Sequence, residues 1–249
     1  MNKKSSDDII KDLVSKSRKA QFVFEKYNQQ EVDEVVTAVA WSLCKPLNNK
    51  KISDLAVHAT GLGNSNHKIL KNKRKTLGLL RDLKNIKTVG VINEDKKKGI
   101  IEIAKPVGVV AAVTPSTNPA ATPINNIINA LKGRNSIIIS PSPAGAEVFQ
   151  DLLMLINSEL KKVGAPENLI QTIGGEVKKE LTYKLMENVD LVIVTGSINN
   201  VIQASKSGTK AIGVGQGNVI SIVDESADLE EALSKIKSSK IFDNATSCS

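Results

Sequence analysis

Apolar residues recur at helical spacing through the first eighty positions of the chain. Val32, Val35, Val36 and Val39 illustrate one such stripe. Residues three and four apart share one face of an α-helix, so the pattern predicts amphipathic helices. The predicted helices span residues 7–27, 30–43, 53–60 and 67–83. Gly61 then breaks the pattern and indicates a helix stop.

The pattern changes near Thr88 into short runs of β-branched residues. Residues 89–92 and 99–103 flank a charged turn, which predicts a two-stranded hairpin. Beyond it, apolar runs alternate with helical segments, one of which begins at Ser142 as the N-cap. The runs that predict strands are 107–113, 136–139, 169–173, 189–194 and 219–223. This alternation predicts an α/β fold in which helices flank a parallel sheet.

The composition and net charge narrow the classes of partner that the protein is expected to bind. The net charge is +8 and aromatic residues make up 3% of the chain. With so few aromatics, base stacking is disfavoured, and no nucleic-acid partner is expected. The lysine-rich runs 71–75 and 96–98 are interpreted as solvated surfaces, with attraction of phosphorylated ligands as the functional alternative.

The location of the protein follows from similar arguments. The first ten residues lack the apolar core of a secretory signal. The apolar run 107–113 is too short to span a bilayer, so no membrane partner is expected. The two cysteines, Cys44 and Cys248, do not make a disulfide framework. A cytoplasmic protein is the resulting expectation.

Three predicted strand ends are rich in small polar residues and proline. Folds of this class bind ligands at the carboxyl ends of their strands, where backbone N–H groups that open a helix favour a phosphate. The candidate nucleotide-binding residues are Thr114, Pro115, Ser140, Pro141, Thr195, Gly196 and Ser197. The same residue types also serve as ordinary helix caps, so each group alone supports either interpretation.

Gly213 and Gly215 belong to a glycine triplet that precedes a predicted strand instead of opening a helix. The triplet lacks the spacing of the dinucleotide fingerprint. A flexible wall that lies close to a substrate is its functional interpretation, and Gly213 and Gly215 are included among the candidate cofactor-binding residues.

The two cysteines differ in their surroundings. Cys44 follows Leu43 on an apolar stripe and is expected in the core. Cys248 lies in a polar, small-residue segment, which favours a reactive thiol. His58 and His67 are isolated from other metal-binding residues, so no metal site is predicted.

Taken together, these segments resemble the aldehyde dehydrogenase superfamily. Residues 106–110 running into 114–119 look like its first strand and oxyanion loop, and residues 195–197 match its phosphate-proximal turn. Cys248 falls where the family has its nucleophile. The resemblance implies a Rossmann-type sheet, with NAD or NADP as cofactor. It also implies a thioester at Cys248 and an oxyanion held by Thr117 or Asn118.

Two departures from the hydrolytic members of the superfamily point to its CoA-acylating branch. Those members carry a glutamate that activates the deacylating water, whereas no Asp or Glu occurs in residues 191–223 of this chain. They also place a lysine where this chain has Ser140. Coenzyme A is therefore the implied co-substrate. Residues 244–249 are most similar to acylating sulfoacetaldehyde dehydrogenases, which makes sulfoacetaldehyde the implied aldehyde.

The resemblance also implies a domain plan. Residues 1–235 correspond to the NAD-binding lobe, including a strand arm over about 88–105, and residues 236–249 to the start of a catalytic domain that is truncated here. The isolated chain is expected to be inactive, and the full-length form to be a homo-oligomer. The alternatives are a non-catalytic nucleotide-binding module and a fragment that interacts with another subunit.

Overall fold

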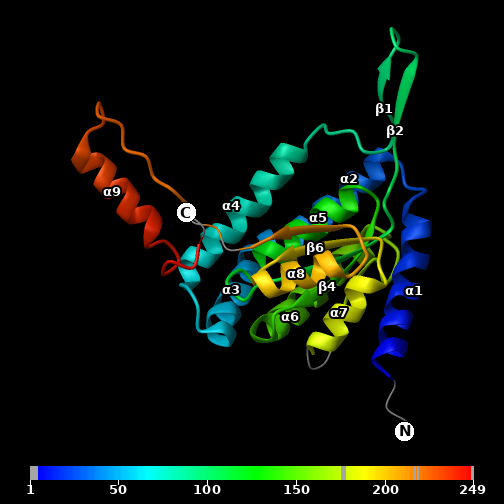
Figure 1. The fold of residues 1–249 in the computed structure, drawn as a ribbon, viewed down its shortest axis with the longest axis horizontal. Coiled ribbons are helices and arrows are strands. Elements are labelled where there is room, and N and C mark those ends of the chain that lie inside the picture. Colours follow the sequence, from blue (N-terminus) through cyan, green and yellow to red (C-terminus); the bar gives the residue numbers. More distant parts are fainter. Residues whose placement is uncertain (1–4, 175–177, 216, 218, 248–249) are drawn as a thin grey trace.

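The computed structural model of the chain describes residues 5–174, 178–215, 217 and 219–247. Its centre is a five-stranded parallel sheet between two layers of helices, as the ribbon in Figure 1 shows. The strands are β3 (Val109–Thr114), β4 (Ser136–Pro141), β5 (Ile170–Thr172), β6 (Leu191–Thr195) and β7 (Ala211–Val214), in the spatial order β5-β4-β3-β6-β7. The predicted α/β fold is confirmed.

Helices connect these strands and precede the sheet. The connecting helices are α5 (Ala121–Lys132), η1 (Pro143–Gly145) with α6 (Ala146–Lys162), α7 (Lys179–Glu187) and α8 (Ile198–Lys206). The N-terminal helices are α1 (Ser6–Phe24), α2 (Gln29–Cys44), α3 (Pro46–Thr60) and α4 (Ser65–Leu83). Gly61 ends α3 in the left-handed conformation, with φ of 65°. The helices and the stop that the periodicity predicts are therefore present.

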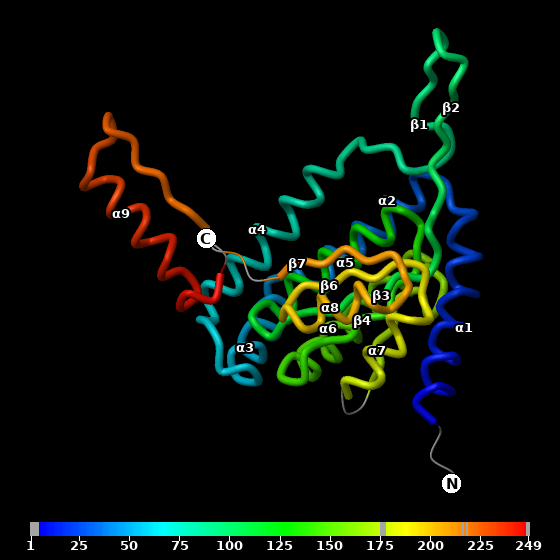
Figure 2. Tube along the Cα trace, in the orientation of Figure 1, coloured from blue at the N-terminus to red at the C-terminus, as the bar shows by residue number. Residues whose placement is uncertain are grey.

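The central strand β3 is buried on both faces, which is why its sequence is apolar throughout. Val110 and Ala112 point into a core formed with α2, α5 and α6. Val109, Ala111 and Val113 point into a second core formed with α1, α7 and α8. Figure 2 shows the two helical layers on either side of the sheet. Alternate side chains of β3 thus pack against the helical layers on both sides of the sheet.

The strand predicted at 219–223 is wrong, and the strand β7 was not predicted. Residues 219–223 pair with no other strand, and Ile220 and Ile222 are 81% and 91% exposed. The parallel partner of β6 is instead Ala211–Val214. A β-branched run forms a strand only where a neighbour accepts its hydrogen bonds, and this run leads away from the sheet (Figure 1).

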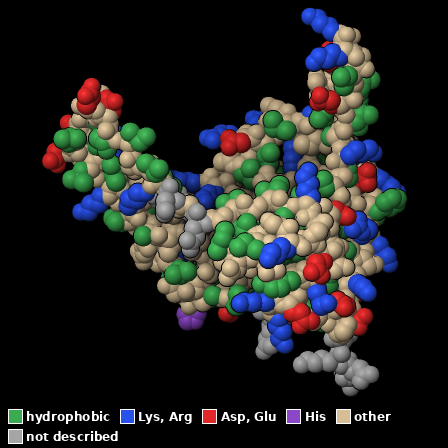
Figure 3. Space-filling view, in the orientation of Figure 1, with side chains coloured by type: hydrophobic (Ala, Val, Ile, Leu, Met, Phe, Trp, Pro, Cys, Tyr) green, Lys and Arg blue, Asp and Glu red, His purple; other side chains and the backbone are tan. Residues whose placement is uncertain are grey.

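Two elements project from the body. One is the antiparallel hairpin β1 (Gly90–Asp95) and β2 (Ile100–Ala104), which confirms the predicted strand arm. The other is α9 (Leu229–Lys240), none of whose residues is buried. Hydrophobic side chains are visible on both projections in Figure 3. Within the part of the chain that is described, no helix has the length and apolar character needed to cross a membrane.

Candidate active site

A cavity of about 520 Å³ opens at the carboxyl ends of β3, β4 and β6. It brings together all seven residues that the sequence suggested at the strand ends: Thr114, Pro115, Ser140, Pro141, Thr195, Gly196 and Ser197. Strands that are parallel and adjacent end at the same edge, so these three separate segments meet. The cavity is therefore located where this fold class binds nucleotides.

Several of the lining residues also act as helix caps. Ser197 accepts a hydrogen bond from the backbone N–H of Asn200 and begins α8. Ser142 accepts one from Gly145, 3.2 Å away, and begins η1. Helix capping does not use every polar group at this end of the sheet. The hydroxyl oxygen of Thr114 is buried with no hydrogen-bond partner among the described residues.

Gly213 and Gly215 do not line this cavity. Gly213 lies on β7, and a Cβ added to it would be 2.7 Å from Cγ1 of Val201 on α8. No described atom lies within 4 Å of the corresponding position on Gly215. In this structure Gly213 lets α8 approach β7 closely.

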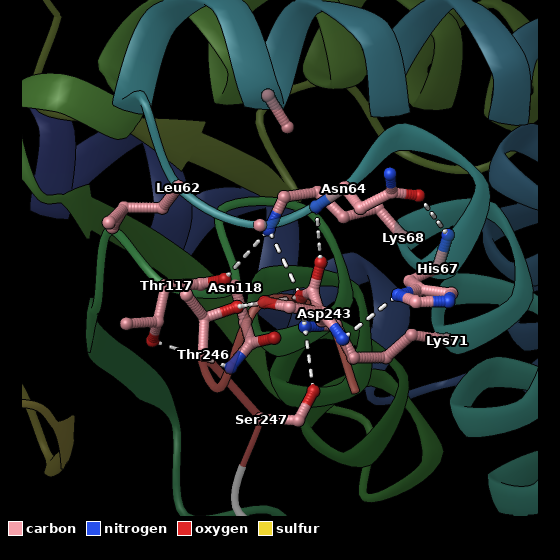
Figure 4. Close-up of polar contacts among 12 residues, drawn as sticks. Leu62, Asn64, His67, Lys68, Lys71, Thr117, Asn118, Asp243, Thr246 and Ser247 are labelled. Atoms are coloured by element: carbon pink, nitrogen blue, oxygen red, sulfur yellow. Dashed lines mark hydrogen bonds and ion pairs between the residues drawn. The ribbon is translucent and has the colours of Figure 1, made fainter. Parts of the chain in front are cut away.

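A second polar cluster lies where the loop after β3 meets the segment that leads to Cys248. Figure 4 shows two lysines of α4, Lys68 and Lys71, converging on the carboxylate of Asp243. Lys68 Nζ also donates to the backbone oxygen of Thr117 over 3.2 Å. Lys71 Nζ also donates to the hydroxyl of Ser247 over 3.2 Å. The helix α4 thus joins the predicted oxyanion loop to the residue that precedes the predicted nucleophile.

Asp243 accepts more hydrogen bonds than these. The backbone N–H of Asn64 donates to its Oδ1 over 2.8 Å, and the hydroxyl of Thr246 donates to its Oδ2 over 2.8 Å. The side chain of Asp243 is completely buried. Burial raises the pKa of this carboxyl, but the bonds from Lys71, Asn64 and Thr246 outweigh burial and hold the pKa below its usual range.

The backbone around Asp243 forms an unusual turn. Asp243, Asn244 and Ala245 have φ values of 55°, 52° and 60°, a left-handed conformation that costs energy in residues with a side chain. Contacts to α4 and to the loop before it hold the turn. The Asn244 amide donates to the Gly63 carbonyl over 2.9 Å. The backbone N–H of Asp243 donates to His67 Nδ1 over 3.0 Å.

Burial lowers the pKa of Lys71, and the bond to Asp243 opposes this effect. Two ammonium groups, at 3% and 5% side-chain exposure, face one carboxylate. The described part of this cluster therefore carries a surplus of positive charge.

A smaller cavity of about 420 Å³ lies beside Ser247. Three of the residues that line it, Lys71, Arg74 and Lys75, are cationic, and no described carboxylate lines it. The positive field of these side chains favours an anionic group at this position.

Sequence analysis missed the lysine cluster. The run 71–75 was interpreted as a solvated helix face, which is wrong for Lys71 and Asn72, because both are buried. The ring of His67 stacks on Phe242, with the two ring centroids 4.6 Å apart. The available signal was a polar stripe at helical spacing, formed by the buried residues Lys68, Lys71, Asn72 and Thr76.

The other candidate residues are the two cysteines and the two residues of the predicted oxyanion loop. Cys248 lies outside the described residues. Cys44 is half-buried and not fully in the core as expected, and burial raises the pKa of its thiol. Asn118 and Thr117 lie on one loop, where the Asn118 amide donates to the Thr117 hydroxyl over 3.4 Å. Among the described residues, no group of three or more His, Cys, Asp or Glu could hold a metal ion.

The sequence of the chain is similar to those of known aldehyde dehydrogenases. The sequence profile of the aldehyde dehydrogenase family matches residues 3–249, so the chain belongs to that family. It is 53% identical to the sulfoacetaldehyde dehydrogenase (acylating) of Cupriavidus necator, over 95% of this chain and 48% of that protein. The chain spans about half the length of the curated relatives it matches.

Solved structures of related enzymes have the same fold. An acetylating aldehyde dehydrogenase from Geobacillus thermoglucosidasius superposes with a TM-score of 0.92 at 35% identity, covering 98% of this chain and 54% of that one. A propionaldehyde dehydrogenase from Rhodopseudomonas palustris, solved with bound propionyl-CoA, gives a TM-score of 0.85 at 30% identity, covering 96% of this chain and 52% of that one.

Proposed function

We propose that this chain forms the dinucleotide-binding lobe and the nucleophile segment of a CoA-acylating aldehyde dehydrogenase. The reaction converts an aldehyde, CoA and NAD(P) into an acyl-CoA and NAD(P)H. The observation that carries the proposal is the joining of Thr117 and Ser247 through Lys68, Lys71 and Asp243. Residues 1–235 would form the lobe, and residues 236–249 would begin the catalytic domain.

The cavity at the strand ends fits a dinucleotide. A Cβ built on Gly196 meets no atom of the described residues within 4 Å, so a phosphate can approach the backbone of this turn. The buried hydroxyl of Thr114 offers an unused hydrogen-bonding group. Lys179, at the start of α7, is the charged residue among the described lining. Thr114, Pro115, Ser140, Pro141, Thr195, Gly196 and Ser197 would hold NAD or NADP there.

The chemistry would centre on Cys248. Its thiolate adds to the aldehyde carbon and forms a thiohemiacetal. The oxyanion accepts hydrogen bonds from the Cys248 backbone N–H and from Thr117 or Asn118. When bound, NAD(P) accepts the hydride that leaves the same carbon, so that a thioester remains. The CoA thiol then attacks the thioester, releases acyl-CoA and regenerates the Cys248 thiolate.

The use of CoA instead of water follows from a missing base. No Asp or Glu occurs in residues 191–223, so this stretch supplies no carboxylate to activate water. The thioester would persist until a thiol reaches it. The acylating relatives support this part of the proposal.

The proposed substrate is an aldehyde that carries an anionic group, with sulfoacetaldehyde as the example. The cationic side chains of Lys71, Arg74 and Lys75 around the cavity beside Ser247 favour such a group. The similarity to the Cupriavidus necator enzyme supports the same choice. The full-length enzyme would act as a cytoplasmic homo-oligomer with no nucleic-acid or membrane partner.

The test is an assay of the enzyme produced from its complete reading frame. We expect NAD(P)H formation from sulfoacetaldehyde to require CoA and to disappear in Cys248→Ala. Titration calorimetry of the 249-residue chain should show that it binds NAD or NADP, and that Cys248→Ala does not weaken this binding. Equal NAD(P)H release without CoA would instead indicate a hydrolytic enzyme, and binding without turnover a non-catalytic module.

A further inference from the structure

The strand-end cavity contains positive charge and no described negative charge. Among the described residues that line this cavity of about 520 Å³, Lys179 is charged and none has a carboxylate. The side chain of Lys179 is exposed and forms no hydrogen bond or ion pair with another described residue. Its ammonium group is therefore available to an anionic group of a ligand in the cavity.

Helix α7 holds Lys179 near the carboxyl end of β4. The hydroxyl groups of Ser140 on β4 and Thr182 on α7 are hydrogen-bonded over 2.8 Å, and this contact is buried. Lys179 precedes Thr182 by three positions, so the two side chains share one face of the helix. Thr182 and Tyr183 both line the cavity, as Lys179 does. The face of α7 that carries Lys179 is therefore the face that borders the ligand space beside β4.

The first turn of α7 offers further donors. Its N-cap residue is Lys178, whose side chain makes no capping hydrogen bond. Backbone N–H groups of a first turn that no described side chain caps can donate to a phosphate. Glu180, the acidic residue of this turn, is exposed and is not among the cavity-lining residues. The end of α7 next to the cavity thus favours an anion.

The neighbouring strand lacks the carboxylate that would oppose such an anion. In doubly wound folds that bind NAD, an Asp or Glu accepts a hydrogen bond from the 2′-hydroxyl of the adenine ribose, whereas NADP-binding forms have a basic residue nearby. The acidic residue belongs to the region of the second parallel strand, which is β4 in this chain. No Asp or Glu occurs in residues 103–146, a stretch that includes β3, β4 and the turns after both. This stretch therefore supplies no negative charge to repel a 2′-phosphate.

We propose that the cavity selects NADP over NAD, and that Lys179 binds the 2′-phosphate. This inference rests on the proposed function for the presence of a dinucleotide in the cavity, and it names which dinucleotide is preferred. Lys179 takes no part in the chemistry of the reaction. It is a specificity-determining residue for the cofactor.

The test is titration calorimetry of the enzyme produced from its complete reading frame, without aldehyde or CoA. The probes are NADP, NAD and two adenosine halves, 2′,5′-ADP and 5′-AMP, which differ only in the 2′-phosphate. We expect 2′,5′-ADP to bind about tenfold more tightly than 5′-AMP, and NADP to exceed NAD by a similar factor. Both preferences should decrease as the ionic strength rises, because Lys179 is exposed.

Variants at Lys179 separate recognition from a structural role. Lys179→Met should weaken NADP binding about tenfold and leave NAD binding within about twofold. Lys179→Arg should keep the preference for NADP. Lys179→Glu should reverse it, because a carboxylate repels the 2′-phosphate and accepts a hydrogen bond from the 2′-hydroxyl. A residue that only supports the fold would not reverse the preference.

The matched control is Lys178→Met, which removes the adjacent exposed lysine that is not among the cavity-lining residues. The preference should remain nearly unchanged in this variant. Its loss in Lys178→Met, with no loss in Lys179→Met, would overturn the role of Lys179. Tighter binding of 3′,5′-ADP than of 2′,5′-ADP would also overturn the inference, because that phosphate pattern belongs to CoA.

Two further results would contradict the proposal. One is equal affinity for 2′,5′-ADP and 5′-AMP, and the other is an equal loss of NAD and NADP binding in Lys179→Met. In both cases the cavity still binds a nucleotide, so the proposed function stands while this inference fails. Failure of every probe to bind would instead overturn the proposed function together with the inference.

Discussion

Asp243 supplies the only carboxylate that the described residues place between Lys68 and Lys71. A buried ion pair often contributes little net stability compared with apolar residues of similar volume. Removing one partner is different, because the remaining charge stays buried without compensation. The turn at Asp243 therefore depends on this carboxylate far more than a surface turn would.

Asp243→Asn should release the segment 241–247 from α4. We expect a loss of about 3 kcal/mol in docking free energy, the usual cost of breaking a buried pair. Hydrogen exchange at the Asn64 amide, which donates to Asp243 over 2.8 Å, measures it directly. Asp151→Asn is the matched control: its partner Lys51 has a 60% exposed side chain, so the change should cost under about 1 kcal/mol.

Acid should act through the same carboxylate. The pKa of Asp243 is lowered in the folded chain, so its contribution is fully present above the unfolded value of about 3.9 and is lost as pH falls through the folded value. Protection of the Asn64 amide should fall over this window in the wild type and stay flat in Asp243→Asn. An equal fall in both would show that another group controls docking.

Sequence patterns located the strand-end residues but not the lysine cluster. Thr114, Ser140 and Thr195 were predictable because each follows an apolar strand, and parallel strands end together. The pairing of Lys71 with Asp243 joins positions 172 residues apart, and no local pattern encodes it. A lysine within a basic run ordinarily faces solvent, so its burial could be learned only from the tertiary structure.

At the scale of elements, the contact between α8 and β7 depends on Gly213. This edge strand has four residues, and α8 packs closely against it. A methyl group at Gly213 would lie 2.7 Å from Val201 Cγ1, closer than such atoms can approach. Close packing of α8 on β7 therefore requires a residue without a side chain at position 213.

Gly213→Ala should lower the free energy of unfolding by about 1–3 kcal/mol, the range for overpacking. Gly215→Ala, where no atom of the described residues lies within 4 Å, should leave it nearly unchanged. Chemical denaturation of the two variants measures the difference. Equal stability of both, with weaker dinucleotide binding in each, would instead favour the binding role suggested by the sequence.

Strand β7 also explains why the sequence pattern predicted an edge strand at residues 219–223 instead of at 211–214. Residues 219–223 are rich in β-branched side chains and predicted a strand, whereas 211–214 contain a glycine and gave a weaker signal. Strand formation depends on an available partner as well as on propensity. The edge of β6 is occupied by Ala211–Val214, and this choice is a property of the folded sheet. The helices and the inner strands were predictable because their periodicity is long and regular.

At the scale of the whole molecule, stability is unevenly distributed. The strands β3 and β4 are buried on both faces, whereas no residue of α9 is buried and Leu229 and Leu233 are 71% and 62% exposed. Regions with few buried apolar contacts open at low free energy. The body and its projections should therefore exchange their amide hydrogens on separate timescales.

Hydrogen exchange with mass spectrometry should show α9 exchanging within seconds, while β3 and β4 remain protected for far longer. The measurement is made across a range of protein concentrations. Protection of α9 comparable to that of the sheet would contradict the expectation and would show that association covers its apolar face. The hairpin β1–β2 serves as an internal comparison, because it projects but has its own ladder of hydrogen bonds.

The long sequence separation within the lysine cluster also affects how the chain folds as it is made. Lys68 and Lys71 precede Asp243 by 175 and 172 residues. At 5–20 residues per second, they leave the ribosome roughly 9–35 seconds before their counter-ion. During that interval both ammonium groups need water, so this face of α4 must remain open while the sheet assembles beside it. The arrival of Asp243 then closes the site, so docking of the nucleophile segment follows assembly of the sheet.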